Sequence, residues 1–172
     1  MGVAGYSEIA RILGLNSVAE RYADIAKKMA MKWEEMANEG DHYRLAFDRN
    51  NTWSQKYNII WDKMWNLNIF PNNVISKEIN YYLTKQNLYG LPLDSRRDYT
   101  KSDWIMWTAA MSPNREIFEK FVDPLYKYIN ETTSRVPISD WHDTKTGRMT
   151  GFKARSVTGG YWIQVLMDKM NH

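Results

Sequence analysis

The sequence predicts an all-α fold, an array of αα-hairpins that forms about half of an α/α toroid. Three observations predict it: an internal repeat of about 46 residues, two kinds of helix in alternation, and long polar loops before one kind. With 172 residues the chain is long enough for one domain, and 14% aromatic residues exclude a disordered protein. We therefore expect residues 1–172 to form a single helical domain.

The repeat shows first in three short apolar segments, Leu45–Asp48, Leu91–Asp94 and Val136–Ser139, which begin 46 and 45 residues apart. With an offset of 46, the apolar residues 59–61 align with residues 105–107. A fixed period with apolar residues in matching places indicates repeated supersecondary units. Each unit is interpreted as one helical hairpin.

The chain begins with an expected helix over Gly2–Leu13, and three amphipathic helices follow along the sequence. The first of these carries apolar residues spaced by 3 or 4, which are Val18, Tyr22, Ile25, Met29, Trp33 and Met36. Such spacing predicts one buried stripe and one hydrated face. The three amphipathic helices are expected over Ser17–Asn38, Asn72–Gln86 and Asn114–Thr132.

Three further segments are apolar on nearly all sides: Ser54–Leu67, Asp103–Met111 and Ser156–Met170. A helix that is apolar all round must be enclosed by other helices. The alternation of the two kinds predicts an inner and an outer layer, with seven helices or about three and a half hairpins. A helical solenoid of the HEAT kind has a similar period, but its loops are short, so the toroid is favoured.

Three polar loops, residues 41–53, 90–102 and 135–155, lead into the apolar helices, and we expect Ser54, Ser102 and Ser156 to cap those helices. Because the repeat is regular, the loops should emerge at one end of the array. Their charged side chains would then converge on one mouth, and loops on a rigid scaffold often carry functional sites.

Four carboxylates of these loops are candidate acid/base groups. Asp94 and Asp140 are the first choices, with Asp48 or Asp103 as substitutes. Asp103 stands at a helix start, where a capping role is the simpler interpretation. Asp62, inside an apolar helix, should be enclosed and either paired or shifted in pKa.

Substrate-binding candidates come from the same loops. Arg96 and Arg155 could bind a carboxylate or amide by paired hydrogen bonds, or form structural ion pairs with a loop Asp. Lys101 is a further candidate for binding substrate. Trp53 and Trp141 lie in loops and are the best candidates for stacking on a sugar, whereas most other tryptophans should fill the core.

Several classes of site and partner are excluded or disfavoured. The chain has no Cys, which excludes a thiolate nucleophile and a zinc–thiolate site, and its net charge of +3 gives little support for nucleic-acid binding. Residues 140–143 (Asp-Trp-His-Asp) lack metal-ligand spacing and are interpreted as a turn, so we expect no metal and no cofactor. No apolar run approaches the roughly 18 residues that span a bilayer.

Six blocks of sequence resemble the C-terminal region of the glutaminase A family, and they occur in order over nearly the whole chain: residues 40–48 (GDHYRLAFD), 52–58 (TWSQKYN), 89–96 (YGLPLDSR), 99–104 (YTKSDW), 135–141 (RVPISDW) and 151–160 (GFKARSVTGG). This resemblance implies a six-hairpin α/α toroid, similar to that of the six-hairpin glycosidases. It also implies that this chain is a C-terminal fragment without the upstream regions.

The implied activity is hydrolysis of the side-chain amide of glutamine to glutamate and ammonia, on a small-molecule substrate. Two alternatives stay open, a glycoside hydrolase acting on a glycan and a non-catalytic helical binding module. The family resemblance implies a secreted, periplasmic or cell-surface parent protein. A half-ring would expose the apolar sides of its first and last helices, so we expect the isolated chain to be inactive, to need the N-terminal remainder of its parent, and to self-associate as a dimer.

Overall fold

The computed structural model describes residues 1–170, which form a mostly helical fold with one small two-stranded sheet. Seven α-helices and two 3-10 helices lie within these residues. In order the elements are α1 (Gly2–Ile12), α2 (Asn16–Ala37), η1 (Tyr57–Ile59), α3 (Ile60–Met64), α4 (Asn72–Leu83), β1 (Tyr99–Lys101), α5 (Ser102–Ala109), α6 (Arg115–Glu131), β2 (Trp141–Asp143), η2 (Ser156–Trp162) and α7 (Ile163–Met170).

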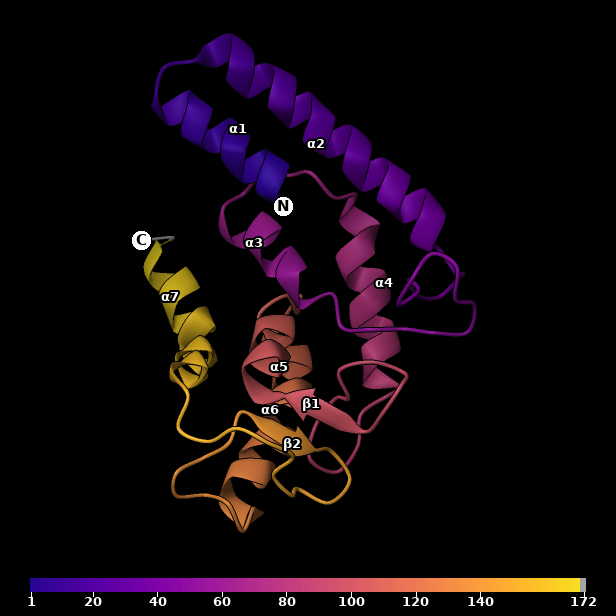
Figure 1. Cartoon of the computed structure of the whole chain (residues 1–172), viewed down its shortest axis with the longest axis vertical. Helices are drawn as coiled ribbons and strands as arrows, with labels where there is room; N and C mark the ends of the chain where they lie inside the picture. The colour runs from indigo at the N-terminus through magenta and orange to yellow at the C-terminus, as the bar shows by residue number, and fades with distance from the viewer. Residues whose placement is uncertain (171–172) are drawn as a thin grey trace.

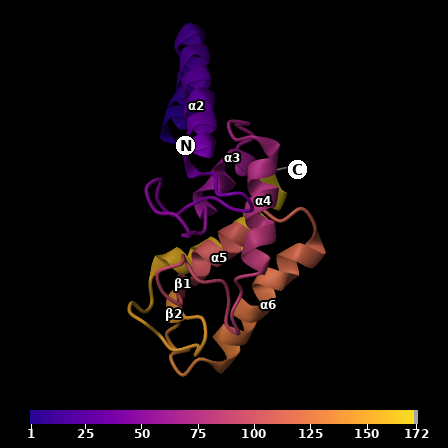
Figure 2. The same cartoon turned by 90° about the vertical axis from the view of Figure 1, so that its right-hand side faces the viewer.

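The elements are arranged along the long axis of the molecule. The α1–α2 hairpin lies at one end, and the sheet with the neighbouring end of α6 lies at the other (Figure 1). Helices α3, α5 and α7 lie between these ends, and α4 and α6 lie beside α3 and α5 (Figures 1 and 2). The predicted helices are therefore confirmed in number and order.

The first apolar helix is shorter than predicted, and the third covers its predicted range but is a 3-10 helix over Ser156–Trp162. Residues 54–56 were expected to be helical, but the Gln55 backbone N–H donates to Leu93 O and that of Lys56 donates to the Tyr82 hydroxyl. Because these donors are used by neighbouring segments, the helix begins only at Tyr57. At the other end, Asn66 and Asn68 adopt left-handed φ angles of 51° and 53°, which end α3.

The main core lies between the α3–α4 and α5–α6 pairs. Its fully buried members include Ile60 of α3, Ile79 of α4, Ile105 of α5 and Phe121 of α6. These residues stand on the stripes that the periodicity predicted. Burying such a side chain contributes about 1.5–3 kcal/mol, so this core accounts for much of the stability.

The predicted apolar stripe of α2 is wrong in detail. The buried side chains of this helix are its alanines, Ala19, Ala26, Ala30 and Ala37, whereas Met29 and Met36 are exposed. Alanines let α1 and the Ile69–Phe70 segment approach α2 closely, and Ser7 of α1 donates a hydrogen bond to Ala19 O. The large apolar residues therefore border the buried alanines, and of them Trp33 packs against the main core.

The three polar loops lie side by side. Strands β1 and β2 pair antiparallel with Thr100 opposite His142, and Ser54 forms an isolated bridge with Asp94. These pairings join the loop before η1 to the loop before α5, and the latter to the loop before η2. Adjacent loops at the starts of the inner helices agree with the predicted mouth.

The predicted serine caps are wrong. None of η1, α5 and η2 has a side-chain capping hydrogen bond, and the residues before their first turns are Lys56, Lys101 and Arg155. Ser54 instead accepts a hydrogen bond from the Lys56 ammonium. The side-chain cap that does form is Asn114, whose Oδ1 accepts from Ile117 N at 3.0 Å at the start of α6.

Apolar side chains are exposed at the two ends of the array. On α7, Val165 and Leu166 are each 50% exposed, and Trp162 just before it is 69% exposed. At the other end Ile12 of α1 is 83% exposed. A groove of about 570 Å³ runs between α1, the end of α3 and Met170 of α7. None of the helices in residues 1–170 combines the length and apolar character needed to cross a membrane.

Candidate functional site

The candidate site lies at the start of α5, where the loop after β2 and the 3-10 helix η2 pack against this helix. Four residues predicted from the sequence meet here: Lys101, Asp103, Asp140 and Arg155. Lys101 ends β1 and is paired with Trp141 of β2, which brings Asp140 next to the first turn of α5. The backbone N–H of Ser102 donates to Asp140 O at 2.8 Å and locks this arrangement.

Asp140 is fully buried and forms the ionic centre of the site. Its Oδ2 lies 3.1 Å from the Lys101 ammonium and 3.1 Å from the Arg155 guanidinium. Its Oδ1 has no hydrogen-bond partner among residues 1–170. Asp140 is therefore ion-paired with two cations through one of its oxygens.

Aromatic rings cover the two cations. The Lys101 ammonium lies 4.4 Å from the centre of the Trp141 ring and 5.0 Å from that of Phe152, and the Arg155 guanidinium lies 4.6 Å from the Phe152 ring centre. Cation–π contacts of this kind contribute about 0.5–2 kcal/mol each. The ring of Trp141 is thereby engaged by Lys101, so a sugar could stack on that face only by displacing the ammonium.

Asp103 differs from the other carboxyls of the loops. It is 4% exposed, and burial raises its pKa to about 6. The negative charge of Asp140 adds to the rise, whereas hydrogen bonding to the backbone N–H groups of Asp103 and Trp104 and the charge of Lys101 oppose it. Within the described residues its Oδ1 has no hydrogen-bond partner. A carboxyl with a pKa near neutrality can both accept and release a proton under ordinary conditions.

Tyr161 of η2 contacts the first turn of α5 at the site. Its hydroxyl lies 2.6 Å from Ser102 Oγ, which itself lies 3.2 Å from Asp140 O. Since Ser102 has one hydroxyl hydrogen, the consistent arrangement is Tyr161 O–H to Ser102 Oγ and Ser102 O–H to Asp140 O. Burial raises the pKa of Tyr161 to about 12, with the charges of Asp103 and Asp140 contributing, so its phenol keeps its proton.

Asp94 and Arg96 form a separate pair. Arg96 donates from Nε to Asp94 Oδ1 at 3.0 Å and from its terminal nitrogen to Oδ2 at 2.7 Å, and its backbone N–H also reaches Oδ1. The pair lies at a pocket of about 370 Å³ whose walls include Trp33, Tyr57 and Phe70. Asp94 is 4% exposed, but both of its carboxylate oxygens accept hydrogen bonds from Arg96.

Two predicted site residues, Asp48 and Trp53, take no part in the ion pairs of Asp94 and Asp140. Asp48 is exposed in the turn closed by the Arg49 N–H to Ala46 O hydrogen bond. Trp53 is 8% exposed and packs between Tyr81 and Tyr82, with ring centres 6.0 Å away from each. Shared position at one mouth stays a prediction for Asp48, whose exposed turn is not part of the ion pairs of Asp94 and Asp140.

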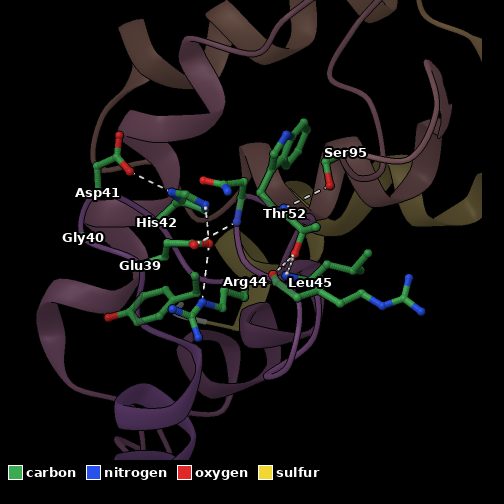
Figure 3. A network of polar contacts seen from close by, with 12 residues as sticks. Glu39, Gly40, Asp41, His42, Arg44, Leu45, Thr52 and Ser95 are labelled. Carbon is green, nitrogen blue, oxygen red and sulfur yellow. Dashed lines mark hydrogen bonds and ion pairs between the residues drawn. The ribbon is translucent and has the colours of Figure 1, made fainter.

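The loop that carries Trp53 is held by its own polar network (Figure 3). His42 Nδ1 lies 2.7 Å from Asp41 Oδ1, and His42 Nε2 lies 3.5 Å from Glu39 Oε2. Glu39 Oε2 also lies 3.5 Å from Arg44 Nε. The His42 ring stacks on Tyr81 at 4.2 Å. This network positions the loop against α4 and is interpreted as structural.

Other buried polar groups that the sequence singled out have structural partners. Asp62 is buried, as predicted, and its two oxygens accept hydrogen bonds from Ile69 N and Phe70 N, which fixes the turn after α3. His142 is fully buried, stacks on Tyr128 at 3.6 Å and lies 2.8 Å from Tyr89 O through Nε2. Burial lowers its pKa to about 4, so the ring is neutral. Among residues 1–170 no three acidic or histidine side chains are grouped closely enough to hold a metal ion.

Three neighbours of Asp103 were missed at the level of sequence: Trp107, Gly160 and Tyr161. Trp107 stands four residues after Asp103 on α5, and this spacing places both on one helix face. This four-residue spacing could have identified Trp107 as a neighbour of Asp103 from the sequence. The approach of Gly160 and Tyr161 to α5 depends on the path of the long loop before η2, which no local pattern encodes.

This chain is similar to known proteins of the glutaminase A type. A family model described as the glutaminase A six helical-hairpin domain matches residues 1–165. Glutaminase A of Aspergillus oryzae is 30% identical over 97% of this chain, and a probable glutaminase of Arthroderma benhamiae is 26% identical over 98% of it. No solved structure gives a significant match.

The alignments cover only part of these relatives. The chain spans 25% of the length of the Aspergillus protein and 23% of that of the Arthroderma protein. The match to the family model nevertheless extends over nearly the whole chain, and the resemblance inferred from the six sequence blocks is confirmed. The chain belongs to the glutaminase A family, within its six helical-hairpin domain.

Proposed function

We propose that this chain is part of a glutaminase A-like hydrolase that converts the side-chain amide of L-glutamine to glutamate and ammonia. The observation that carries the proposal is Asp103, a buried carboxyl with an unpartnered oxygen among residues 1–170 and a pKa of about 6. Its neighbour Asp140 is ion-paired with Lys101 and Arg155, and the charge of Asp140 adds to the rise in the pKa of Asp103. A carboxyl whose pKa is raised toward neutrality by burial and by a neighbouring carboxylate is typical of acid/base sites.

In this proposal Asp103 acts as the general base and then as the general acid. Ionised Asp103 takes a proton from a water molecule as the water oxygen bonds to the amide carbon. Asp103 then returns the proton to the amide nitrogen, the carbon–nitrogen bond breaks, and ammonia leaves. The products are the carboxylic acid and ammonia, so all atoms of the amide and the water are accounted for.

The geometry changes the ranking of the candidate carboxylates. Asp94 and Asp140 were the first choices, but Asp94 is occupied by Arg96 and Asp140 is tied to two cations. Asp140 is better suited to position Lys101 and Arg155 and to raise the pKa of Asp103. Arg96 remains a candidate for binding the charged end of the substrate, because its side chain is 56% exposed.

The alternatives make different demands on the site. A binding module without catalysis would leave the site carboxylates fully paired, which Asp103 is not within the described residues. A glycoside hydrolase would use exposed aromatic rings, whereas Trp53 is buried and Trp141 is engaged by Lys101. Both observations favour the amidohydrolase.

The architecture in this proposal is about half of a six-hairpin toroid, with further hairpins supplied by the remainder of a longer parent. Its support is the exposed apolar surface of α1 and α7 and the quarter of the relatives' length that the chain spans. The isolated chain should then be folded, inactive and self-associating, with a symmetric dimer as the simplest form. Light scattering over a range of concentrations tests this, and a strictly monomeric chain would contradict it.

A secreted, periplasmic or cell-surface location of the parent is part of the same proposal, and its support is the resemblance to extracellular-type glutaminases. Cell fractionation with an antibody against this chain tests the location.

The activity is tested by assaying the parent protein for ammonia release from L-glutamine and for sugar release from a panel of glycosides. The proposal expects turnover of glutamine that is lost in Asp103→Asn and kept in Asp48→Asn, since Asp48 lies in an exposed turn. Turnover of glycosides alone would favour the second candidate, and turnover unaffected by Asp103→Asn would contradict the assignment of Asp103.

A further inference from the structure

A pocket of about 370 Å³ lies beside the Asp94–Arg96 pair, and neither Asp103 nor Asp140 is among the residues of its wall. Its size falls in the range of small-molecule sites, about 300–1,000 Å³. Two cationic side chains, Lys56 and Arg96, and one anionic side chain, Asp94, line it. The excess of positive charge favours a ligand that carries a negative charge.

Lys56 is not the group that would bind such a ligand. Its ammonium donates to Tyr43 O at 3.1 Å, to Ser54 O at 3.0 Å and to Ser54 Oγ at 2.9 Å. A lysine ammonium has three hydrogens, and these three acceptors use all of them. Arg96 is therefore the cation of the pocket that has hydrogens left for a ligand.

The guanidinium of Arg96 has two edges that can hold a carboxylate, and Asp94 occupies one of them. Asp94 accepts hydrogen bonds from Arg96 Nε at 3.0 Å and from Arg96 Nη2 at 2.7 Å. The other edge, between Nη1 and Nη2, keeps at least one hydrogen on each nitrogen, and such a fork matches the two oxygens of a carboxylate. Asp94 is 4% exposed, whereas the Arg96 side chain is 56% exposed. The buried carboxylate thus orients the guanidinium and leaves its second edge for a ligand.

Half-buried aromatic rings form the apolar part of the pocket wall, and they belong to Trp33, Tyr57 and Phe70. Trp33 packs edge-on against Phe70 with ring centres 5.5 Å apart, and Tyr57 stacks on Trp104 of α5 at 4.1 Å. These contacts hold the rings in place, and the exposed parts of the rings can cover a short apolar chain. The wall therefore combines a fork for an anion with a surface for an aliphatic group, as small-molecule sites do.

We propose that this pocket binds the carboxylate end of a small acid with a short aliphatic chain. The second edge of Arg96 donates two hydrogen bonds to the carboxylate, and the chain packs against the rings of Trp33 and Phe70. A neutral head group binds less well, because it lacks the charge and the paired oxygens that the fork recognises. The inference deepens the proposed function and rests on it for one point, the identity of the acid, which is then L-glutamine held by its α-carboxylate.

Indole NMR on the full 172-residue chain tests the pocket directly. The chain is labelled with ¹⁵N at tryptophan, the Trp33 signal is assigned with Trp33→Phe, and hexanoate or hexanamide is added up to tens of millimolar. The two probes have the same chain and differ in the charge of the head group. A saturable shift of the Trp33 indole signal is expected with hexanoate, and the affinity for hexanamide should be at least about tenfold lower. No shift with hexanoate, or equal affinities for the two probes, would overturn the proposal.

The chain offers a matched control for Arg96. Arg97 is adjacent and exposed, and it is not among the residues that line the pocket. Arg96→Gln and Arg97→Gln remove the same charge from neighbouring positions. Arg96→Gln should lower the affinity for hexanoate at least about tenfold, whereas Arg97→Gln should leave it within about twofold of the wild type. Equal losses in the two variants would mean that only the overall charge attracts the acid, and would overturn the proposal.

A second variant covers the case in which Arg96→Gln does not fold because the buried Asp94 loses its cation. Arg96→Lys keeps a positive charge for Asp94 but has no second edge, since a lysine ammonium is a point charge without a planar fork. The affinity for hexanoate should again fall at least about tenfold. An unchanged affinity in Arg96→Lys would overturn the proposal.

L-Glutamine is added to the same samples to separate this inference from the proposed reaction. A shift of the Trp33 signal with glutamine that is lost in Arg96→Gln is expected. Binding of hexanoate without binding of glutamine would keep the pocket as a carboxylate site and refute glutamine as its occupant. Turnover of glutamine by the parent, in a protein whose pocket binds no carboxylate, would refute the pocket and leave the proposed reaction intact.

Discussion

Asp94 and Asp103 are two carboxylates with the same exposure, 4%, and opposite surroundings. Asp94 receives three hydrogen bonds from Arg96, two residues away in sequence. Asp103 lies against η2, more than 50 residues later in the chain, and its Oδ1 receives no hydrogen bond from residues 1–170. Asp94 is thus paired with a neighbouring cation, whereas burial raises the pKa of Asp103 to about 6.

This difference separates a structural carboxylate from one that can exchange protons. The Asp94–Arg96 pair closes a turn and lies at a pocket, so its role can be fulfilled without any change of protonation. Asp103 has no ion-pair partner of this kind among residues 1–170, and it stands in the first turn of α5 with a raised pKa. A buried carboxyl with a raised pKa is the better candidate for proton exchange.

The largest effect is expected for Asp103→Asn in the parent protein. An amide cannot accept and return the proton, so turnover should fall by about 100-fold or more, the usual contribution of a general acid/base. In the wild type, turnover should rise as the pH increases through about 6, because the base must be ionised. Initial rates of ammonia release from pH 4 to 9 measure both effects, and an unchanged profile in Asp103→Asn would contradict the assignment.

The next largest effect is expected for Asp140→Asn on the stability of the chain. The substitution leaves Lys101, whose side chain is 12% exposed, and Arg155 without their counter-ion. Breaking a buried ion pair from one side costs about 3–5 kcal/mol. Urea unfolding followed by tryptophan fluorescence should show this loss, and a change below about 1 kcal/mol would mean that Asp140 is not the anchor of this site.

A somewhat smaller effect concerns the pH dependence of stability. The folded-state pKa of Asp103, about 6, lies above its ordinary value of 3.8, so its stabilising contribution is present at low pH and is lost as the pH rises through about 6. The size is about 3 kcal/mol. His142 has the opposite sign: its pKa of about 4 lies below the ordinary 6.5, so its contribution is lost as the pH falls toward 4.

The two contributions are separated by comparing the wild type with Asp103→Asn from pH 4 to 7. Relative to the wild type, the variant should gain stability by up to about 3 kcal/mol as the pH rises from 4 to 7, because it lacks the penalty of ionising Asp103. Parallel stability curves for the two proteins would mean that the pKa of Asp103 is ordinary.

The smallest effect is expected for Asp94→Asn. Arg96 is 56% exposed and can be solvated by water when its partner is neutral, so the free energy of unfolding should fall by only about 1 kcal/mol. Turnover in the parent should fall far less than in Asp103→Asn. A loss of turnover as large as that of Asp103→Asn would reverse the ranking of the two carboxylates.

Most of the fold could be predicted because helix identity depends on local periodicity. Helix α6, expected over Asn114–Thr132, is observed over Arg115–Glu131. The prediction was wrong where the backbone hydrogen bonds of one segment go to another, as at Gln55 and Lys56, or where alanines rather than large side chains are buried, as in α2. Such partners are distant in sequence, and a local pattern contains no information about them.

The site was predictable as a set of residues but not as a set of pairs. The sequence indicated Lys101, Asp103, Asp140 and Arg155, and the structure brings these four together. The sequence did not indicate that Asp48 would remain in solvent. It left open whether Arg96 and Arg155 bind substrate or form ion pairs with a loop Asp, and both form such pairs, Arg96 with Asp94 and Arg155 with Asp140. The repeat aligned Asp48, Asp94 and Ser139, yet Asp94 and Ser139 are buried and Asp48 is exposed, because their loops contact different neighbours.

The pKa of the Asp103 carboxyl is the quantity that tests the central claim most directly. It can be measured from the ¹³C shift of the side-chain carboxyl in chain labelled at aspartate, with Asp103→Asn to assign the signal. The account predicts a midpoint of about 6. A midpoint near 4, the ordinary value for an exposed aspartate, would contradict it and leave Asp103 as a carboxylate like the others.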